Sequence, residues 1–202
     1  MNPTMPATSQ PSFNPPNAAQ LAPLAICAVV AHARQGLLPP FAATLGLDYA
    51  EYQDLLQHHP AIQQAQAAIP EHEYPAIAGT SPAQFTALFY MLQENCESVD
   101  MKCQWLARAI AAAGFGSRHL WQDLGMSGRD DVSALLRTFF PALYAGNVHH
   151  YKWKKFLFAE LGRRQGMPDL RPPKCSGCDQ FHICFPETGI SAHTASNDLH
   201  KT

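Results

Sequence analysis

The stretch DVSALLRTFFPAL, residues 131–143, decides the fold class of this chain. Its apolar residues recur every three or four positions, which places them on one face of an α-helix. They are Val132, Leu135, Leu136, Phe139, Phe140 and Leu143. Proline has no backbone N–H to donate inside a helix, so Pro141 should kink or shorten this one. The stretch predicts an amphipathic helix with one buried face.

The same helical spacing recurs on both sides of this stretch. Three further apolar stripes are Phe85, Leu88, Phe89 and Leu92; Trp105, Leu106, Ala109, Ile110 and Ala113; and Trp153, Phe156, Leu157 and Leu161. Strand signals are weak, because no long run alternates apolar and polar residues. The sequence therefore predicts an all-α fold, a compact bundle of about six helices.

Capping signals predict where two of these helices begin. Asp48 is followed three residues later by Glu51, which is the pattern of a capping box. Ser81 and Gln84 have the same spacing, with a proline between them at the first helical position.

Composition divides the chain into three parts. Residues 1–20 are rich in Pro, Asn, Ser and Thr, and we expect a disordered N-terminal arm. Residues 21–187 should form a single helical domain, which ends in a cysteine-rich metal-binding loop over 170–187. The polar residues 188–202 should form a disordered tail.

Charge and hydropathy narrow the class of partner and the compartment. The formal net charge is -2, which argues against nucleic acid as a partner. The first twenty residues contain no Lys or Arg and lack the charged region of a secretory signal. The apolar stretch that follows is too short to span a membrane. We therefore expect a cytoplasmic protein without a membrane partner, in which disulfides are disfavoured and clustered cysteines bind metal.

Three cysteines lie close together near the C-terminal end of the sequence. Cys175, Cys178 and Cys184 have the spacing C-x2-C-x5-C, and Gly177 allows a tight turn between the first two. Thiolates bind soft or borderline metals, so these three residues are the predicted ligands.

The remaining ligand depends on which metal is bound. Zinc would need a fourth protein ligand, and His182 is a candidate, although it lies very close to Cys184 in the sequence. Cys103 is a second candidate, although its place near a helix–helix turn, with Cys96, favours a half-buried structural residue. A cuboidal iron–sulfur cluster would fit three thiolates and leave one corner open. The residues alone leave these alternatives open.

Basic residues are concentrated just before the cysteine loop. Residues 152–174 contain seven basic and two acidic side chains, so the remainder of the chain is acidic. Lys152, Lys154 and Lys155 are expected to face outward from their helix. They form either a solvated helix face or a basic collar that attracts an anion or an acidic partner.

Four segments taken together resemble the NifQ family. They occur in the family's order, ahead of the cysteine loop: WLARAIAAA (105–113), RHLWQDLG (118–125), SALLRTFFPALYAGNV (133–148) and YKWKKFLFAELGRRQGM (151–167). Within RHLWQDLG, Leu120 and Trp121 are expected in the core and Asp123 is expected to cap or pair. The resemblance covers residues 35–187.

The resemblance implies a function that composition does not reveal. It implies a carrier of a molybdenum–iron–sulfur cluster, which donates molybdenum for biosynthesis of the nitrogenase iron–molybdenum cofactor. The implied partners are the NifEN cofactor-maturation scaffold, the nitrogenase iron protein, and molybdate or a molybdenum–sulfur species. Such a protein is a metallochaperone rather than an enzyme.

This sequence departs from the family pattern at two positions. The family motif C-x4-C-x2-C-x5-C places its first cysteine where this chain has Leu170, and a further cysteine is often found where it has Gly114. Two alternatives follow. The three thiolates and a histidine could close a structural zinc site in an interaction module, or the chain could be a degenerate homologue that no longer loads molybdenum.

Overall fold

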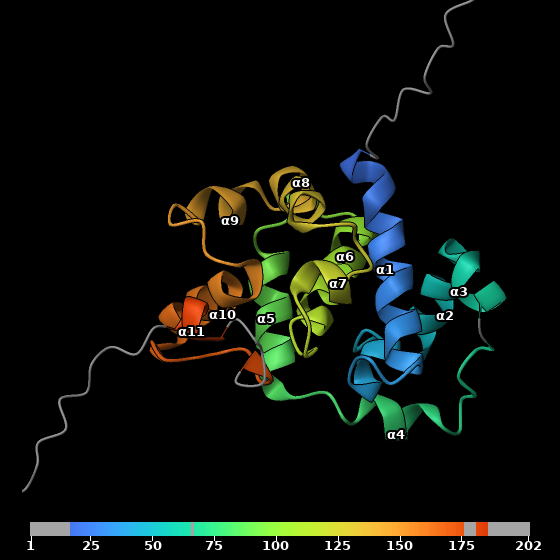
Figure 1. The fold of residues 1–202 in the computed structure, drawn as a ribbon. Coiled ribbons are helices and arrows are strands. Elements are labelled where there is room, and N and C mark those ends of the chain that lie inside the picture. Colours follow the sequence, from blue (N-terminus) through green and yellow to red (C-terminus); the bar gives the residue numbers. More distant parts are fainter. Residues whose placement is uncertain (1–16, 66, 176–180, 186–202) are drawn as a thin grey trace, which may run out of the picture.

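The computed structural model describes residues 17–65, 67–175 and 181–185, and within them every regular element is helical (Figure 1). This confirms the predicted all-α fold. The elements are α1 (Ala18–Arg34), η1 (Pro40–Ala43), α2 (Tyr49–His58), α3 (Pro60–Ala65), α4 (Tyr74–Ala78), α5 (Ala83–Gln93), α6 (Met101–Ala113), α7 (Leu120–Asp123), α8 (Arg129–Phe139), α9 (Pro141–Gly146), α10 (Trp153–Gln165) and α11 (Phe181–Cys184). They exceed the predicted six because several are helices of only four to six residues.

Helix α6 lies at the centre of the fold, between α5 and α1 (Figure 1). Its five alanines, from Ala107 to Ala113, are all fully buried. Alanine is small enough to let neighbouring helices approach closely, and it favours the helical state. The four predicted stripes supply the rest of the core, and α10 packs against α5.

Residues 131–143 form helices with a buried apolar face, as predicted. Val132, Leu135 and Leu136 are buried on α8, which ends at Phe139, and α9 begins at Pro141. Proline therefore divides one apolar stripe between two helices.

Of the two predicted capping boxes, one is confirmed and the other is wrong. Asp48 accepts a hydrogen bond from the Glu51 backbone, and the Glu51 side chain accepts one from the Asp48 backbone. At the start of α5 the cap position is Pro82, and the hydroxyl of Ser81 is buried without a hydrogen-bond partner. Because Pro82 has an extended conformation, the helix begins one residue too late for Ser81 to cap it.

The first helix begins within the predicted N-terminal arm. Asn17 caps α1 through a capping box with Gln20, so helical structure starts at Ala18. Residues 1–16 and the predicted tail at 188–202 lie outside the described residues. Throughout the described part of the chain, each helix is too short or too polar to cross a membrane.

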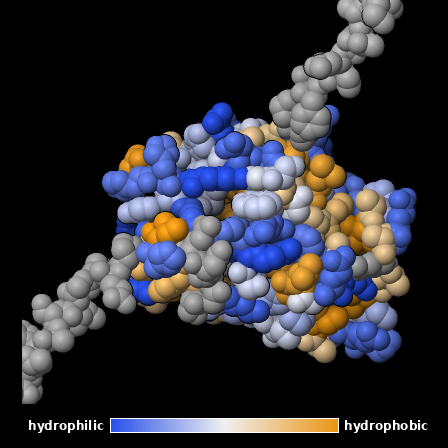
Figure 2. All heavy atoms as spheres, viewed as in Figure 1, coloured by the Kyte–Doolittle hydropathy of each residue, from blue (hydrophilic) through white to orange (hydrophobic). Residues whose placement is uncertain are grey.

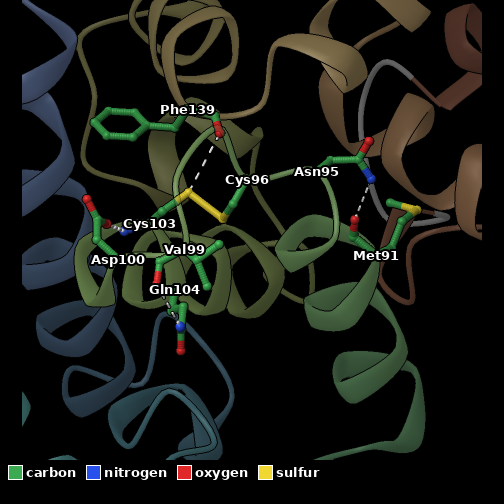
Figure 3. The surroundings of a disulfide bond; sticks show 8 residues. All are labelled: Met91, Asn95, Cys96, Val99, Asp100, Cys103, Gln104 and Phe139. Carbon is green, nitrogen blue, oxygen red and sulfur yellow. Dashed lines mark hydrogen bonds between the residues drawn. A yellow bond between two sulfur atoms is a disulfide. The ribbon is translucent and has the colours of Figure 1, made fainter.

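The structure contains a disulfide that the sequence did not predict. Cys96, in the loop after α5, is bonded to Cys103 in the first turn of α6 (Figure 3). Cys103 is fully buried, and its sulfur lies 3.6 Å from the carbonyl oxygen of Phe139. The bond links the α5–α6 loop to the start of α6, next to the carbonyl oxygen of Phe139 at the end of α8.

Candidate functional site

A pocket of about 340 Å³ lies where the α6–α7 loop, the start of α10 and the cysteine loop meet. We call it the basic pocket. Its lining residues are Gly116, Ser117, Arg118, His119, Leu120, Trp121, Arg129, Val132, Lys152, Trp153, Lys154, Lys155, Pro172, Lys174, Cys175 and Cys184. Four segments of the sequence therefore build one cavity, and two of them include parts of HLWQDLG (119–125) and KWKKF (152–156).

Six cationic side chains line this pocket, and they come from four segments: Arg118, Arg129, Lys152, Lys154, Lys155 and Lys174. The lining itself includes no acidic side chain among the described residues. Hydrophilic residues gather on the face between α8, α10 and α7 (Figure 2). A cleft lined by charge of one sign focuses the electrostatic potential, so the pocket attracts anions.

A buried ion-pair network holds two residues of the pocket lining, Arg118 and Lys154. Asp123 is fully buried, and its carboxylate lies 3.0 Å from Nε of Arg118 and 2.6 Å from Nζ of Lys154. Lys154 also donates to the Gly116 carbonyl oxygen at 3.0 Å. On the other side, Nδ1 of His32 lies 3.0 Å from the Asp123 carbonyl oxygen. The network connects α1, α7 and α10, and thereby fixes the two parts of the pocket lining that come from α7 and α10.

The prediction that Lys154 faces outward is therefore wrong. Its side chain is buried and directed at Asp123, whereas Lys152 and Lys155 remain partly exposed. Burial lowers the pKa of Lys154, and attraction to Asp123 acts in the opposite direction. The prediction that Asp123 pairs is confirmed, and Lys154 is one of its two partners.

Lys155 secures the segment that carries Cys184. Its Nζ donates a 2.5 Å hydrogen bond to the Cys184 carbonyl oxygen, and it lies 4.0 Å from the ring centroid of Tyr151. The ring centroid of Phe185 lies 5.3 Å from Lys155 and 4.8 Å from Arg171. Cation–π contacts of this kind hold the end of the cysteine loop against Lys155 of α10 and Arg171.

Two of the three predicted thiol ligands reach the basic pocket. Cys175, half-buried, and Cys184, buried, both line it. The third, Cys178, lies outside the described residues. Within the described part of the chain, no three His, Cys, Asp or Glu side chains converge closely enough to form a metal site. The complete three-thiol centre therefore remains a prediction.

The two additional ligand candidates have different positions. His182 is exposed on α11, two residues before Cys184. Cys103 is bonded to Cys96, and a disulfide sulfur is not a thiolate, so the structure does not offer Cys103 as a fourth ligand. This corrects both the candidate ligand and the expectation that disulfides are disfavoured. The sequence did contain a signal for this disulfide, because Cys96 and Cys103 lie only seven positions apart across a turn.

The two positions that depart from the family pattern are occupied by packing residues. Leu170 is partly buried and packs against the core. Gly114 follows α6, and a Cβ atom there would lie 3.2 Å from the side chains of Leu88 and Phe158. Leu120 is buried as predicted, and Trp121 is only partly buried against the core. The sequence did not predict that His119, Leu120 and Trp121 would line the pocket.

Comparison with known proteins identifies the family. The NifQ family model matches residues 24–186, which is most of the chain. The chain belongs to the NifQ family. Protein NifQ of Azotobacter vinelandii is 30% identical over 163 residues, which cover 70% of this chain and 76% of that protein.

Other NifQ proteins match over shorter ranges. Protein NifQ of Rhodobacter capsulatus is 33% identical over 42% of this chain and 47% of that protein. Protein NifQ of Klebsiella pneumoniae is 36% identical over 40% of this chain and 48% of that protein. No solved structure gives a significant match to this chain. Membership of the NifQ family gives the chain a role in nitrogen fixation, as an accessory protein of iron–molybdenum cofactor biosynthesis.

Proposed function

We propose that this NifQ protein carries molybdenum in an iron–sulfur cluster and donates it for assembly of the nitrogenase cofactor. In this proposal Cys175, Cys178 and Cys184 bind the cluster, which is the cargo of the protein and not a catalytic group. The receiving partners would be the NifEN scaffold and the nitrogenase iron protein.

The observation that carries the proposal is the convergence of two thiols and six cations on one pocket. Sulfide and thiolate ligands make an iron–sulfur cluster electron-rich, and nearby cations favour such a charge distribution. The basic pocket supplies this environment, because Cys175 and Cys184 lie among Lys152, Lys155 and Lys174.

The position of the cysteines suits transfer as well as binding. Cys175 lies on a loop, and Cys184 lies on a helix of four residues, so neither belongs to the rigid core formed by α1, α5 and α6. A cargo that is held by a surface segment can be handed on without opening the core. Short segments with few buried contacts also have the lowest local stability.

The test is the metal content per chain of protein purified without oxygen from cells grown with molybdate. We expect iron and molybdenum in the unaltered chain. Both should be lost in the variant Cys175→Ala/Cys178→Ala/Cys184→Ala. The matched control is Cys27→Ala, which removes a half-buried cysteine of α1 that lines a different cavity. This control should retain both metals.

Other metal contents would overturn the proposal. One zinc per chain, without iron, would indicate the structural zinc module. Absence of all three metals would indicate a homologue that no longer loads molybdenum. Circular dichroism of each variant would establish that loss of metal does not reflect loss of the helical fold.

A further inference from the structure

We infer that the basic pocket receives molybdenum as a tetrahedral oxyanion, molybdate, on cationic side chains that are distinct from the thiols. This inference rests on the proposed function, because it names the form in which the cargo enters the same pocket. It assigns recognition of the oxyanion to Arg118 and Lys174, which come from different segments.

Two cations of the pocket lining, Arg129 and Lys155, donate to uncharged acceptors. Arg129 donates two hydrogen bonds of 3.0 Å, to the carbonyl oxygens of His150 and Tyr151. Lys155 donates to the carbonyl oxygen of Cys184. Carbonyl oxygens satisfy these donors without neutralising their charge. The single carboxylate of Asp123 contacts two further cations of the lining, Arg118 and Lys154.

Arg118 and Lys154 share Asp123 but differ in what they can offer a ligand. The side chain of Lys154 is only 10% exposed, and its ammonium group already contacts Asp123 and Gly116. The side chain of Arg118 is 33% exposed; its Nε contacts Asp123, and its Nη2 lies 3.3 Å from Nδ1 of His32. A guanidinium group has five N–H donors in a planar fork, so Arg118 can hold Asp123 and still donate to an anion.

The dimensions and walls of the pocket suit a small, strongly charged ligand. Its volume of about 340 Å³ lies near the lower end of the range for small-molecule sites. The side chains of Leu120, Val132 and Trp153 form apolar parts of the wall. Apolar walls lower the local dielectric and strengthen the attraction between cation and oxyanion. Four oxygen acceptors around one centre can accept hydrogen bonds from several sides at once.

The test separates oxyanion binding from cluster binding. Equilibrium dialysis with radioactive molybdate would be carried out on the full chain with Cys175→Ser, Cys178→Ser and Cys184→Ser. We call this variant the thiol-free chain because its pocket has no thiol, although Cys27 of α1 remains. We expect saturable binding that weakens as sodium chloride is raised, because screening acts on the cations. Sulfate should compete at similar concentrations in this thiol-free chain, because it has the same shape and charge.

Charge variants identify the residues responsible. In the same thiol-free background, Arg118→Gln/Lys174→Gln should weaken molybdate binding about tenfold or more, since charge-assisted hydrogen bonds are lost. The matched control is Lys102→Gln, which removes an exposed charge on α6 away from the pocket. It should leave the affinity unchanged. Circular dichroism would confirm that both variants remain folded.

Three results would overturn the inference. They are absence of saturable binding in the thiol-free chain, unchanged affinity in the double charge variant, and binding that neither salt nor sulfate weakens. The proposed function is tested separately, by the iron and molybdenum content of the chain with its cysteines intact. The inference about molybdate binding and the proposed function can therefore each be disproved without the other.

Discussion

The ammonium nitrogen of Lys154 lies 2.6 Å from a carboxylate oxygen of Asp123, and both side chains are buried. The two residues are 31 positions apart, so this pair connects the end of α7 to the start of α10. Burial of either charge alone would be costly, because the protein interior cannot solvate an ion as water does. The pair therefore fixes two pocket-lining segments relative to one another.

Removing one charge of this pair should strongly destabilise the fold. Asp123→Asn leaves Lys154 buried without an anionic partner, and we expect a loss of about 3–5 kcal/mol in the free energy of unfolding. Urea denaturation followed by circular dichroism measures this. The matched control is Asp54→Asn on the exposed face of α2, with an expected change of about 0.5 kcal/mol or less. Equal stability of the two variants would contradict a structural role for the pair.

The burial of Lys154 shows what the sequence could not reveal. Apolar periodicity predicted Trp153 and Phe156 in the core, and both are buried. It gave no reason to turn Lys154 inward, because its partner belongs to another segment and no local pattern connects them. Periodicity locates the faces of single helices, whereas an ion pair between helices depends on tertiary packing.

The same limit applies to the pocket. The cysteine spacing predicted Cys175 and Cys184 as site residues, and the structure places both in the pocket lining. Arg118 and Arg129 were missed because their segments approach the cysteine loop only when α7, α8 and α10 have packed. The short helices α3, α4, α7 and α9 were also missed, since four to six residues are too few to display a period.

The disulfide between Cys96 and Cys103 should stabilise the fold. It closes a short loop, with a separation of seven positions, and restricts the unfolded chain. We expect Cys96→Ser/Cys103→Ser to lower the free energy of unfolding by about 2 kcal/mol, without changing metal content. Alkylation of the unfolded chain with and without reductant, read by mass spectrometry, tests the bond itself. If all six cysteines were modified without reductant, the bond would be absent in the purified protein.

Stability at acidic pH should depend on Glu160. Its carboxylate accepts hydrogen bonds from Arg163 and Arg164, and the bond from Arg163 is the main reason that its pKa falls from 4.5 to about 2. A pKa lowered by folding stabilises the protein above the unfolded value of 4.5, and this stabilisation disappears as the pH falls towards 2.

The variant Glu160→Gln tests this dependence. It should be less stable than the unaltered chain at pH 7, and the difference should shrink as the pH falls from 4.5 to about 2. Salt should reduce the difference at pH 7, because Arg163 is well exposed. Urea midpoints measured over this pH range supply the comparison. A constant difference at every pH would mean that Glu160 acts through packing alone.

Lys155 should govern how firmly the Cys184 segment holds its cargo. The variant Lys155→Met retains the length of the side chain but loses the hydrogen bond to the Cys184 carbonyl and the contact with Phe185. We expect metal release to a chelator to accelerate about tenfold, with little change in unfolding. The matched control is Lys102→Met. The same release rate in both variants would show that Lys155 does not secure the site.

Restoring the family's first cysteine should not improve metal loading. Leu170 packs against the core, and a Cβ atom built on Gly162 would lie 2.9 Å from the Leu170 Cβ, so its side chain is held against α10. Among the described residues, the pocket lining includes Pro172 and Lys174 but not Leu170. A thiol at position 170 would therefore lie in the packed layer beside α10.

The variant Leu170→Cys is expected to have unchanged iron and molybdenum content. It should also lose about 1–2 kcal/mol of stability, because the smaller side chain leaves part of a packed space empty. Metal content per chain and urea denaturation measure the two effects. A clear rise in molybdenum content would mean that the loop rearranges to bring position 170 to the metal. The limitation on loading would then be the missing thiol, and the three-thiolate arrangement would be incomplete.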